Sequence, residues 1–140
     1  MSLLNEAAVE YLLVGGYAVG HHGYPRATGD LDVWIRQSEE NAARVVGAIR
    51  AFGFVTPELD PLRFMGDGRI TRMGLPPNRI EVMTSISGVT FDEAWAERVE
   101  SDWDGVRVPL IDLRLLRRNK RASGRPKDLA DLDELPDPDA

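Results

Sequence analysis

The chain has 140 residues, a formal net charge of −6 at pH 7 and no cysteine. A chain of this length forms one domain, and its net negative charge is unsuited to coating nucleic acid, because such binding relies on lysine and arginine to neutralise phosphates. We see no run of eighteen apolar residues and no charged and then apolar leader after Met1. We therefore expect a cytoplasmic protein that makes no membrane contact, with a single domain over residues 1–135 and a disordered tail over residues 136–140.

The first predicted strand, Tyr11 to Val14, is followed directly by Gly15 and Gly16. A continuous apolar run of this kind is typical of a fully buried strand. The two glycines would let backbone N–H groups approach a ligand closely, and a helix starting there would add the attraction of its dipole for phosphate. A pair of glycines is also an ordinary tight turn between a strand and a helix, so both interpretations stay open.

The second predicted strand begins at Asp30 and carries a second carboxylate at Asp32. Because side chains alternate along a strand, these two carboxylates share one face, and we expect Trp34 on the same face to be exposed or half-buried. Two carboxylates this close resist joint ionisation, which a magnesium ion bound to them and to substrate phosphates would relieve. The alternative is ordinary turn chemistry, since Thr28-Gly29-Asp30 is also a common turn sequence.

The middle of the chain predicts scaffold elements. Apolar residues recur at helical spacing over residues 39–52, where Ser38 would cap the helix and Gly53 would end it. Two antiparallel strands are expected over residues 69–73 and 80–86.

A third carboxylate, Glu81, lies in the second strand of this hairpin. It would join Asp30 and Asp32 if this strand lies beside theirs, and three carboxylates on neighbouring strands are what a two-metal site requires. Alternatively, Glu81 could be an exposed strand residue that pairs with Arg79 or Arg72.

The last third of the chain predicts a helix over residues 91–99, an edge strand over residues 105–111 and a basic helical segment over residues 112–135. This segment begins with Asp112 as a helix cap. Between Asp112 and Asp128 all of its charged residues are basic: Arg114, Arg117, Arg118, Lys120, Arg121, Arg125 and Lys127. A solvated amphipathic helix explains most of them, and we interpret Lys127 and Asp128 as structural.

The segments 14–19 and 23–33 together resemble the nucleotidyltransferase superfamily, whose core is the polymerase-beta-type palm. They are most similar to its Gly-Gly branch, which includes small AbiEii-like toxins and antibiotic-modifying enzymes. The resemblance continues into segments 80–84 and 120–129. It implies an α+β (α/β-like) fold in which a small mixed, twisted sheet carries helices mainly on one face.

The resemblance also implies a set of site residues. Asp30, Asp32 and Glu81 would be catalytic and would hold two Mg²⁺ ions, or Mn²⁺ in their place. Glu81 stands where the superfamily usually has aspartate, and its longer side chain can still reach. The residues expected to bind the nucleotide are Gly15, Gly16, Arg26, Thr28 and Lys120.

The expected reaction is transfer of a nucleoside monophosphate from an NTP to a hydroxyl, with release of pyrophosphate. The acceptor stays open between RNA, a protein and a small molecule, and a toxin–antitoxin component is one expected role. A partner protein or a homodimer could complete the pocket. The alternative is a catalytically silent nucleotide-binding or partner-binding protein with the same fold. A solvated interaction domain with coincidental acids is disfavoured by four motifs in the expected order.

Overall fold

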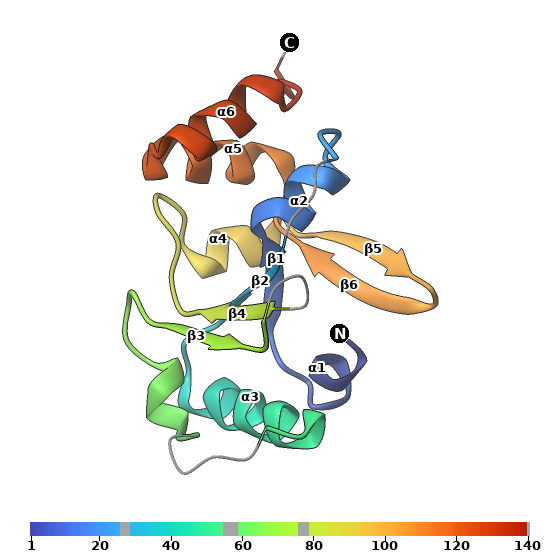
Figure 1. Cartoon of the computed structure of the whole chain (residues 1–140), viewed down its shortest axis with the longest axis vertical. Helices are drawn as coiled ribbons and strands as arrows, with labels where there is room; N and C mark the ends of the chain where they lie inside the picture. The colour runs from blue at the N-terminus through green and yellow to red at the C-terminus, as the bar shows by residue number, and fades with distance from the viewer. Residues whose placement is uncertain (26–28, 55–58, 76–78, 140) are drawn as a thin grey trace.

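The computed structural model describes residues 1–25, 29–54, 59–75 and 79–139. Within these residues, six strands form one mixed sheet in the order β3-β4-β2-β1-β6-β5 (Figure 1). The pairs β1/β6 and β2/β4 are parallel, and the other neighbouring strands are antiparallel. The strands are β1 (Tyr11–Val14), β2 (Asp30–Ile35), β3 (Ile70–Met73), β4 (Arg79–Met83), β5 (Val99–Trp103) and β6 (Val106–Leu110).

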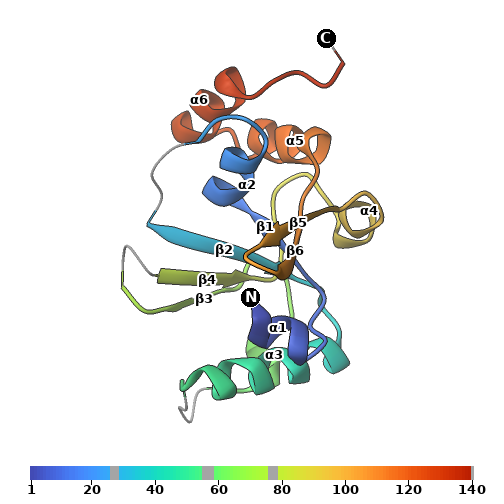
Figure 2. The ribbon, with the colours of Figure 1, turned by 90° about the vertical axis from the view of Figure 1, so that its right-hand side faces the viewer.

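Helices lie on both sides of the sheet (Figure 2). One side carries α1 (Ser2–Glu6) and α3 (Glu39–Phe52), and a 3₁₀ turn, η1 (Pro61–Phe64), packs near α3. The other side carries α2 (Gly15–His21), α4 (Phe91–Ala96), α5 (Leu113–Ser123) and α6 (Pro126–Glu134). The expected class, a mixed α+β fold around a small mixed sheet, is confirmed. The helices divide between the two faces more evenly than the sequence suggested.

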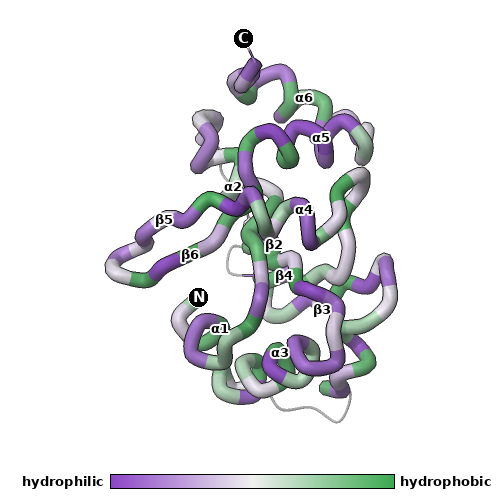
Figure 3. The backbone as a smooth tube through the Cα atoms, turned by 180° about the vertical axis from the view of Figure 1, so that it is seen from behind, coloured by the Kyte–Doolittle hydropathy of each residue, from purple (hydrophilic) through white to green (hydrophobic). Residues whose placement is uncertain are grey.

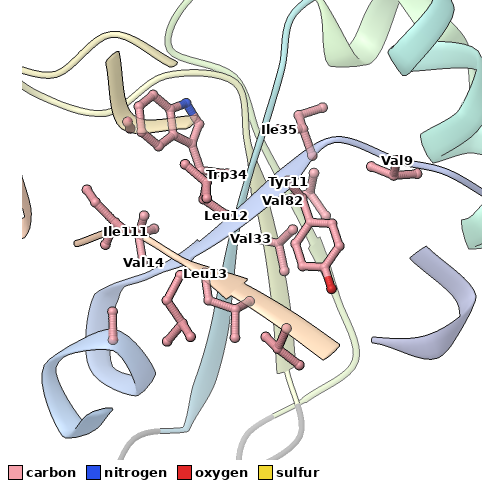
Figure 4. Close-up of a cluster of buried hydrophobic side chains, with 14 of the residues drawn as sticks. Val9, Tyr11, Leu12, Leu13, Val14, Val33, Trp34, Ile35, Val82 and Ile111 are labelled. Atoms are coloured by element: carbon pink, nitrogen blue, oxygen red, sulfur yellow. The ribbon is translucent and has the colours of Figure 1, made fainter. Parts of the chain in front are cut away.

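Strand β2 carries buried apolar side chains on both of its faces, so other elements pack against each face. Val33 and Ile35 are buried toward α1 and α3, together with Val82 of β4 (Figure 4). Trp34 points the other way and meets Phe91 of α4 with the two ring centroids 5.1 Å apart. The expectation that Trp34 is exposed or half-buried was wrong: its exposed fraction is 1%, because α4 closes over it.

Helix α3 begins and ends where the sequence predicts. The Oγ of Ser38 accepts a hydrogen bond from the N–H of Asn41 at 3.0 Å, and Gly53 ends the helix with a φ of 110°. The side-chain amide of Asn41 is buried, and both its nitrogen and its oxygen form hydrogen bonds. The nitrogen donates to the carbonyls of Glu10 and Arg36, and the oxygen accepts the N–H of Glu10. This amide therefore fixes the start of α3 to one end of the β1–β2 pair, where Glu10 precedes β1 and Arg36 follows β2.

The C-terminal third contains a strand that the sequence analysis did not predict. Residues 99–103 form β5, an edge strand antiparallel to β6, so β6 lies inside the sheet and the prediction of an edge strand there was wrong. Pro109 is tolerated because the pairing of β6 with β1 is short, with Leu110 opposite Leu13. Figure 3 shows mainly hydrophilic residues along β5 and hydrophobic residues around β2 at the centre of the sheet.

The expected basic segment at residues 112–135 contains α5 and α6, and Asp112 caps α5 by accepting the N–H of Leu115 at 2.8 Å. Residues 136–139 follow α6, where Arg114 forms an ion pair with Asp139 at 2.8 Å. No helix in the described ranges is both long enough and apolar enough to cross a membrane.

Candidate active site

The site begins where β1 ends at the glycine pair. Val14 lies opposite Asp32 in the β1–β2 register, and α2 starts at the next residue, Gly15, whose φ is +66°. A Cβ at Gly15 would overlap the Oδ2 of Asp32 and lie 2.9 Å from its Cγ. Glycine is therefore required twice at this position, for the left-handed backbone and for the close approach of the Asp32 carboxylate.

The carboxylates meet across the parallel pair β2–β4. Asp32 lies opposite Glu81 in the register, so the condition that the sequence analysis set for Glu81 is met. One oxygen of Asp32, Oδ1, is buried and has no hydrogen-bond partner among the described residues. Burial raises the pKa of Asp32 to about 6, and the negative charges of Glu81 and Asp30 contribute to that increase.

Two arginines accompany these carboxylates. Arg79 donates to both oxygens of Asp30, from Nε at 2.7 Å and from Nη2 at 3.1 Å, and its Nη2 lies 3.3 Å from Glu81. Arg72 donates to the same Glu81 oxygen at 3.1 Å. Glu81 therefore lies opposite Asp32, as the first interpretation requires, and it forms the arginine pairs of the second, although its side chain is only 14% exposed. The hydrogen bond from Arg79 lowers the pKa of Asp30.

The chemistry of this donor set fits a divalent cation. A buried carboxylate oxygen with no hydrogen-bond partner, in a group whose pKa is raised by burial and by like charges, is stabilised by a nearby cation. In the present arrangement no three His, Cys, Asp or Glu side chains of the described residues are gathered closely enough to hold a metal. Asp30 and Glu81 face arginines instead, so gathering all three carboxylates requires them to move.

A cleft of about 390 Å³ joins the start of α2, the carboxylate strands and the α5–α6 junction. It collects six of the eight residues that the sequence assigned to the site: Gly15, Gly16, Asp30, Asp32, Glu81 and Lys120. The other two, Arg26 and Thr28, lie outside the described residues. Side chains that the sequence analysis did not assign to the site also line the cleft: Arg72, Ser85, Ser87, Asn119, Ser123, Arg125 and Lys127.

The wall of the cleft formed by α5 and α6 is basic, but its two lysines differ. The ammonium of Lys120 is buried and lies 3.2 Å from both Asp128 and Asp131. Although burial raises the pKa of Asp128, hydrogen bonds from Arg125, Ser123 and Lys120 outweigh it and lower that pKa to about 2. Lys120 therefore lines the cleft, but Asp128 and Asp131 already neutralise its charge.

Lys127 is a further cation of this wall, at a position where the sequence predicts a structural residue. It is exposed, lines the cleft and has no ion-pair partner in the part of the chain that the structure describes. Its positive charge lowers the pKa of Asp30 and opposes the upward shift at Asp32. The signal in the sequence was its place in Gly-Arg-Pro-Lys, because proline in the first helical turn puts Lys127 at the start of α6.

The two histidines do not line this cleft. His21 ends α2, and the Nε2 of His22 lies 2.8 Å from the carbonyl oxygen of Ile111. Burial lowers the pKa of His22. Both histidines therefore lie at the C-terminal end of α2.

No protein-family model matches the chain, and neither does any curated protein. Among solved structures, the chain is similar to a protein from Thermotoga maritima described as a "putative nucleotidyltransferase (TM1012)", with a TM-score of 0.60 and 15% sequence identity. The similarity covers 94% of this chain and 86% of that chain. At this identity the comparison establishes the fold, and the narrower resemblance to AbiEii-like toxins stays a prediction. The chain therefore has a nucleotidyltransferase-like α+β fold, with a carboxylate-lined cleft where β1, β2 and β4 lie side by side.

Proposed function

We propose that the protein is a metal-dependent nucleotidyltransferase that moves a nucleoside monophosphate from an NTP to a hydroxyl acceptor. The observation that carries this proposal is the Asp32 carboxylate, which lies against Gly15, opposite Glu81, with one buried oxygen that lacks a hydrogen bond. An isolated surface acid would be solvated, whereas this one is partly buried among like charges. Such an arrangement favours a cationic ligand.

Asp30, Asp32 and Glu81 are the residues that would hold Mg²⁺ or Mn²⁺, and a pair of ions is the arrangement we expect. A bound ion would supply neutralisation of phosphate charge and activation of the attacking hydroxyl. Glu81 would also help to accept the proton of that hydroxyl. The similarity to TM1012 supports the proposal at the level of the fold.

The opposite wall of the cleft suits the triphosphate. Lys127 offers an uncompensated charge there, and on the carboxylate side of the cleft α2 begins at Gly15 and Gly16 without a side-chain cap. In the proposed reaction the acceptor oxygen forms a bond to the α-phosphorus, and the bond from that phosphorus to the oxygen bridging to the β-phosphate breaks. Pyrophosphate leaves with the electron pair, and the basic wall stabilises its charge.

Lys120 has an indirect role in this proposal. Its ammonium joins α5 to two aspartates of α6, so it fixes the helix that carries Lys127. The family resemblance predicts that Lys120 neighbours the triphosphate. Its contacts favour support of the α5–α6 junction, with Lys127 as the more available phosphate ligand.

The acceptor can be RNA, a protein or a small molecule. The cleft, about 390 Å³, lies within the usual range for one small-molecule ligand, which leaves little space for a large acceptor inside it. A macromolecular acceptor would therefore present one hydroxyl at the cleft mouth, and a partner protein or second copy could complete its surface. A toxin–antitoxin role is one setting for such a reaction.

The second candidate is a catalytically silent nucleotide-binding or partner-binding protein. The pairing of Asp30 and Glu81 with arginines favours it, because a structural ion-pair network would look the same. The two candidates differ in how NTP binding responds to metal. The enzyme would need a divalent cation to bind NTP, whereas a cleft neutralised by arginines would bind NTP equally well with or without the cation.

Calorimetry with each NTP tests the proposal. We expect binding in Mg²⁺ that is lost in chelator and is lost in Asp32→Asn. The matched control is Asp133→Asn, an exposed acid of α6 that does not line the cleft. Equal affinity in Mg²⁺ and in chelator would contradict metal dependence and leave the silent binder as the better account.

A further inference from the structure

We infer that Arg79 is a displaceable counter-ion of the carboxylate site, which competes with a divalent cation for Asp30 and Glu81. The inference rests on the proposed function in its assumption that these carboxylates receive a cation. It adds a residue that tunes the cation affinity and that does not itself belong to the ligand set.

The geometry shows how Arg79 occupies the site. Its guanidinium donates to both oxygens of Asp30, at 2.7 and 3.1 Å, and also lies 3.3 Å from Glu81. These are the two carboxylates that flank Asp32, one on its own strand and one on the neighbouring strand. Arg79 therefore neutralises the outer members of the cluster, while the inner member keeps a buried oxygen without a partner.

The exposure of Arg79 indicates that this contact can open. Its side chain is 31% exposed, and that of Asp30 is 28% exposed. The contrast is the Lys120–Asp128 pair in the same cleft, where the side chains are only 5% and 1% exposed. Ion pairs that reach water cost little to break, because water solvates both charges, whereas breaking a buried pair leaves an unsolvated charge.

A divalent cation and Arg79 cannot both be favoured at the same carboxylates. Magnesium requires oxygen ligands at about 2.1 Å in a near-octahedral arrangement. An ion bound to Asp30 neutralises the negative charge that attracts the guanidinium, and the positive charge of the ion repels Arg79. Binding therefore includes the cost of releasing Arg79, and removal of that arginine should lower this cost. If Arg79 only held the carboxylates in place, its removal would instead weaken binding of the cation.

The test is a Mn²⁺ titration of the nucleotide-free protein, by calorimetry, with wild type and three variants. Arg79→Gln should bind Mn²⁺ about 3- to 5-fold more tightly, the upper end of the scale expected for one partly exposed ion pair. Arg79→Lys, which keeps the charge, and Arg44→Gln, which removes a partly exposed arginine from an ion pair with Glu40 on α3, should stay within about twofold of wild type. An unchanged or weaker Mn²⁺ affinity in Arg79→Gln would overturn the inference.

A second measurement uses the wild type alone, so it does not depend on the folding of a variant. The Nε–H resonance of Arg79 in NMR spectra should move toward that of a solvated arginine as Mg²⁺ saturates the protein. A resonance that stays in place at saturation would show that Arg79 is not displaced and would contradict the inference.

The inference and the proposed function fail separately. Tighter Mn²⁺ binding by Arg79→Gln in a protein that transfers no nucleotide would support the counter-ion and reject the enzyme. Nucleotide transfer by a wild type whose Mn²⁺ affinity is insensitive to Arg79→Gln would support the enzyme and reject the counter-ion.

Discussion

Replacement of Asp32 by asparagine is expected to stabilise the metal-free protein at neutral pH. The Asp32 carboxyl has a pKa raised from 3.8 to about 6, because it is buried and lies near Glu81 and Asp30. Ionisation of Asp32 above pH 6 therefore opposes folding. The difference between the two pKa values corresponds to roughly 3 kcal/mol in the free energy of unfolding. Asparagine would leave a buried amide group without a partner at the position of Oδ1, which costs about 1 to 2 kcal/mol. We expect a net gain of about 1 to 2 kcal/mol.

The pH dependence of this gain follows from the sign of the pKa shift. The folded state binds the Asp32 proton more tightly than the unfolded state, so wild-type stability falls as pH rises from about 4 to about 6. Above pH 6 the destabilisation is constant, and below about pH 4 it is absent. The advantage of Asp32→Asn should therefore appear between pH 4 and 6 and then stay level.

Urea unfolding in chelator at pH 4, 5, 6, 7 and 8 measures this advantage, with Asp133→Asn as the control for loss of an exposed acid. A variant that is less stable than wild type at pH 7, or a gain that does not change with pH, would refute the electrostatic account of Asp32. If Asp32 were instead a simple turn or cap residue, the variant would lose about 1 kcal/mol at neutral pH.

The remaining predictions concern the basic wall and the glycine turn. Lys127→Gln should weaken NTP binding in Mg²⁺ by about 1 to 2 kcal/mol, while Arg121→Gln, which removes an arginine outside the cleft, should not, as calorimetry can show. Lys120→Ala should lower the free energy of unfolding by about 3 to 5 kcal/mol in urea, because it leaves two buried aspartates without their lysine; near wild-type stability would contradict that role. Gly15→Ala should lower the free energy of unfolding by at least about 1 kcal/mol. Gly47→Ala, within α3 and with open space around it, should be neutral or stabilising, and equal effects of the two variants would refute the close packing at the turn.

Local sequence signals were sufficient to predict most of the carboxylate wall. The alternation of Asp30 and Asp32 with apolar residues sets a strand with one polar face, and the glycine pair after β1 marks the turn against which Asp32 packs. Glu81 needed one further condition, that its strand neighbours β2, and the register of β2 with β4 meets it. These features depend on side-chain periodicity and turn chemistry, which a short segment carries by itself.

The basic wall could not be predicted in the same way, because it depends on how α6 folds back on α5. That packing buries Lys120 between Asp128 and Asp131 and leaves Lys127 facing the cleft, and spacing along the chain does not reveal which lysine is compensated. The position of β6 inside the sheet was missed for a related reason. It depends on long-range pairing with β1 and on β5, whose residues carry polar side chains at exposed positions.

The most direct test of the account is transfer of label from α-³²P-labelled NTPs, in Mg²⁺, to RNA, protein and metabolite fractions of a cell extract. Our account predicts that wild type labels one of these fractions, that chelator abolishes the labelling, and that Asp32→Asn reduces it by several orders of magnitude although the variant is folded. Labelling by Asp32→Asn at the wild-type rate would contradict the assignment of the cleft. No labelling of any fraction by a wild type that binds Mg²⁺ and NTP would favour the silent nucleotide-binding protein.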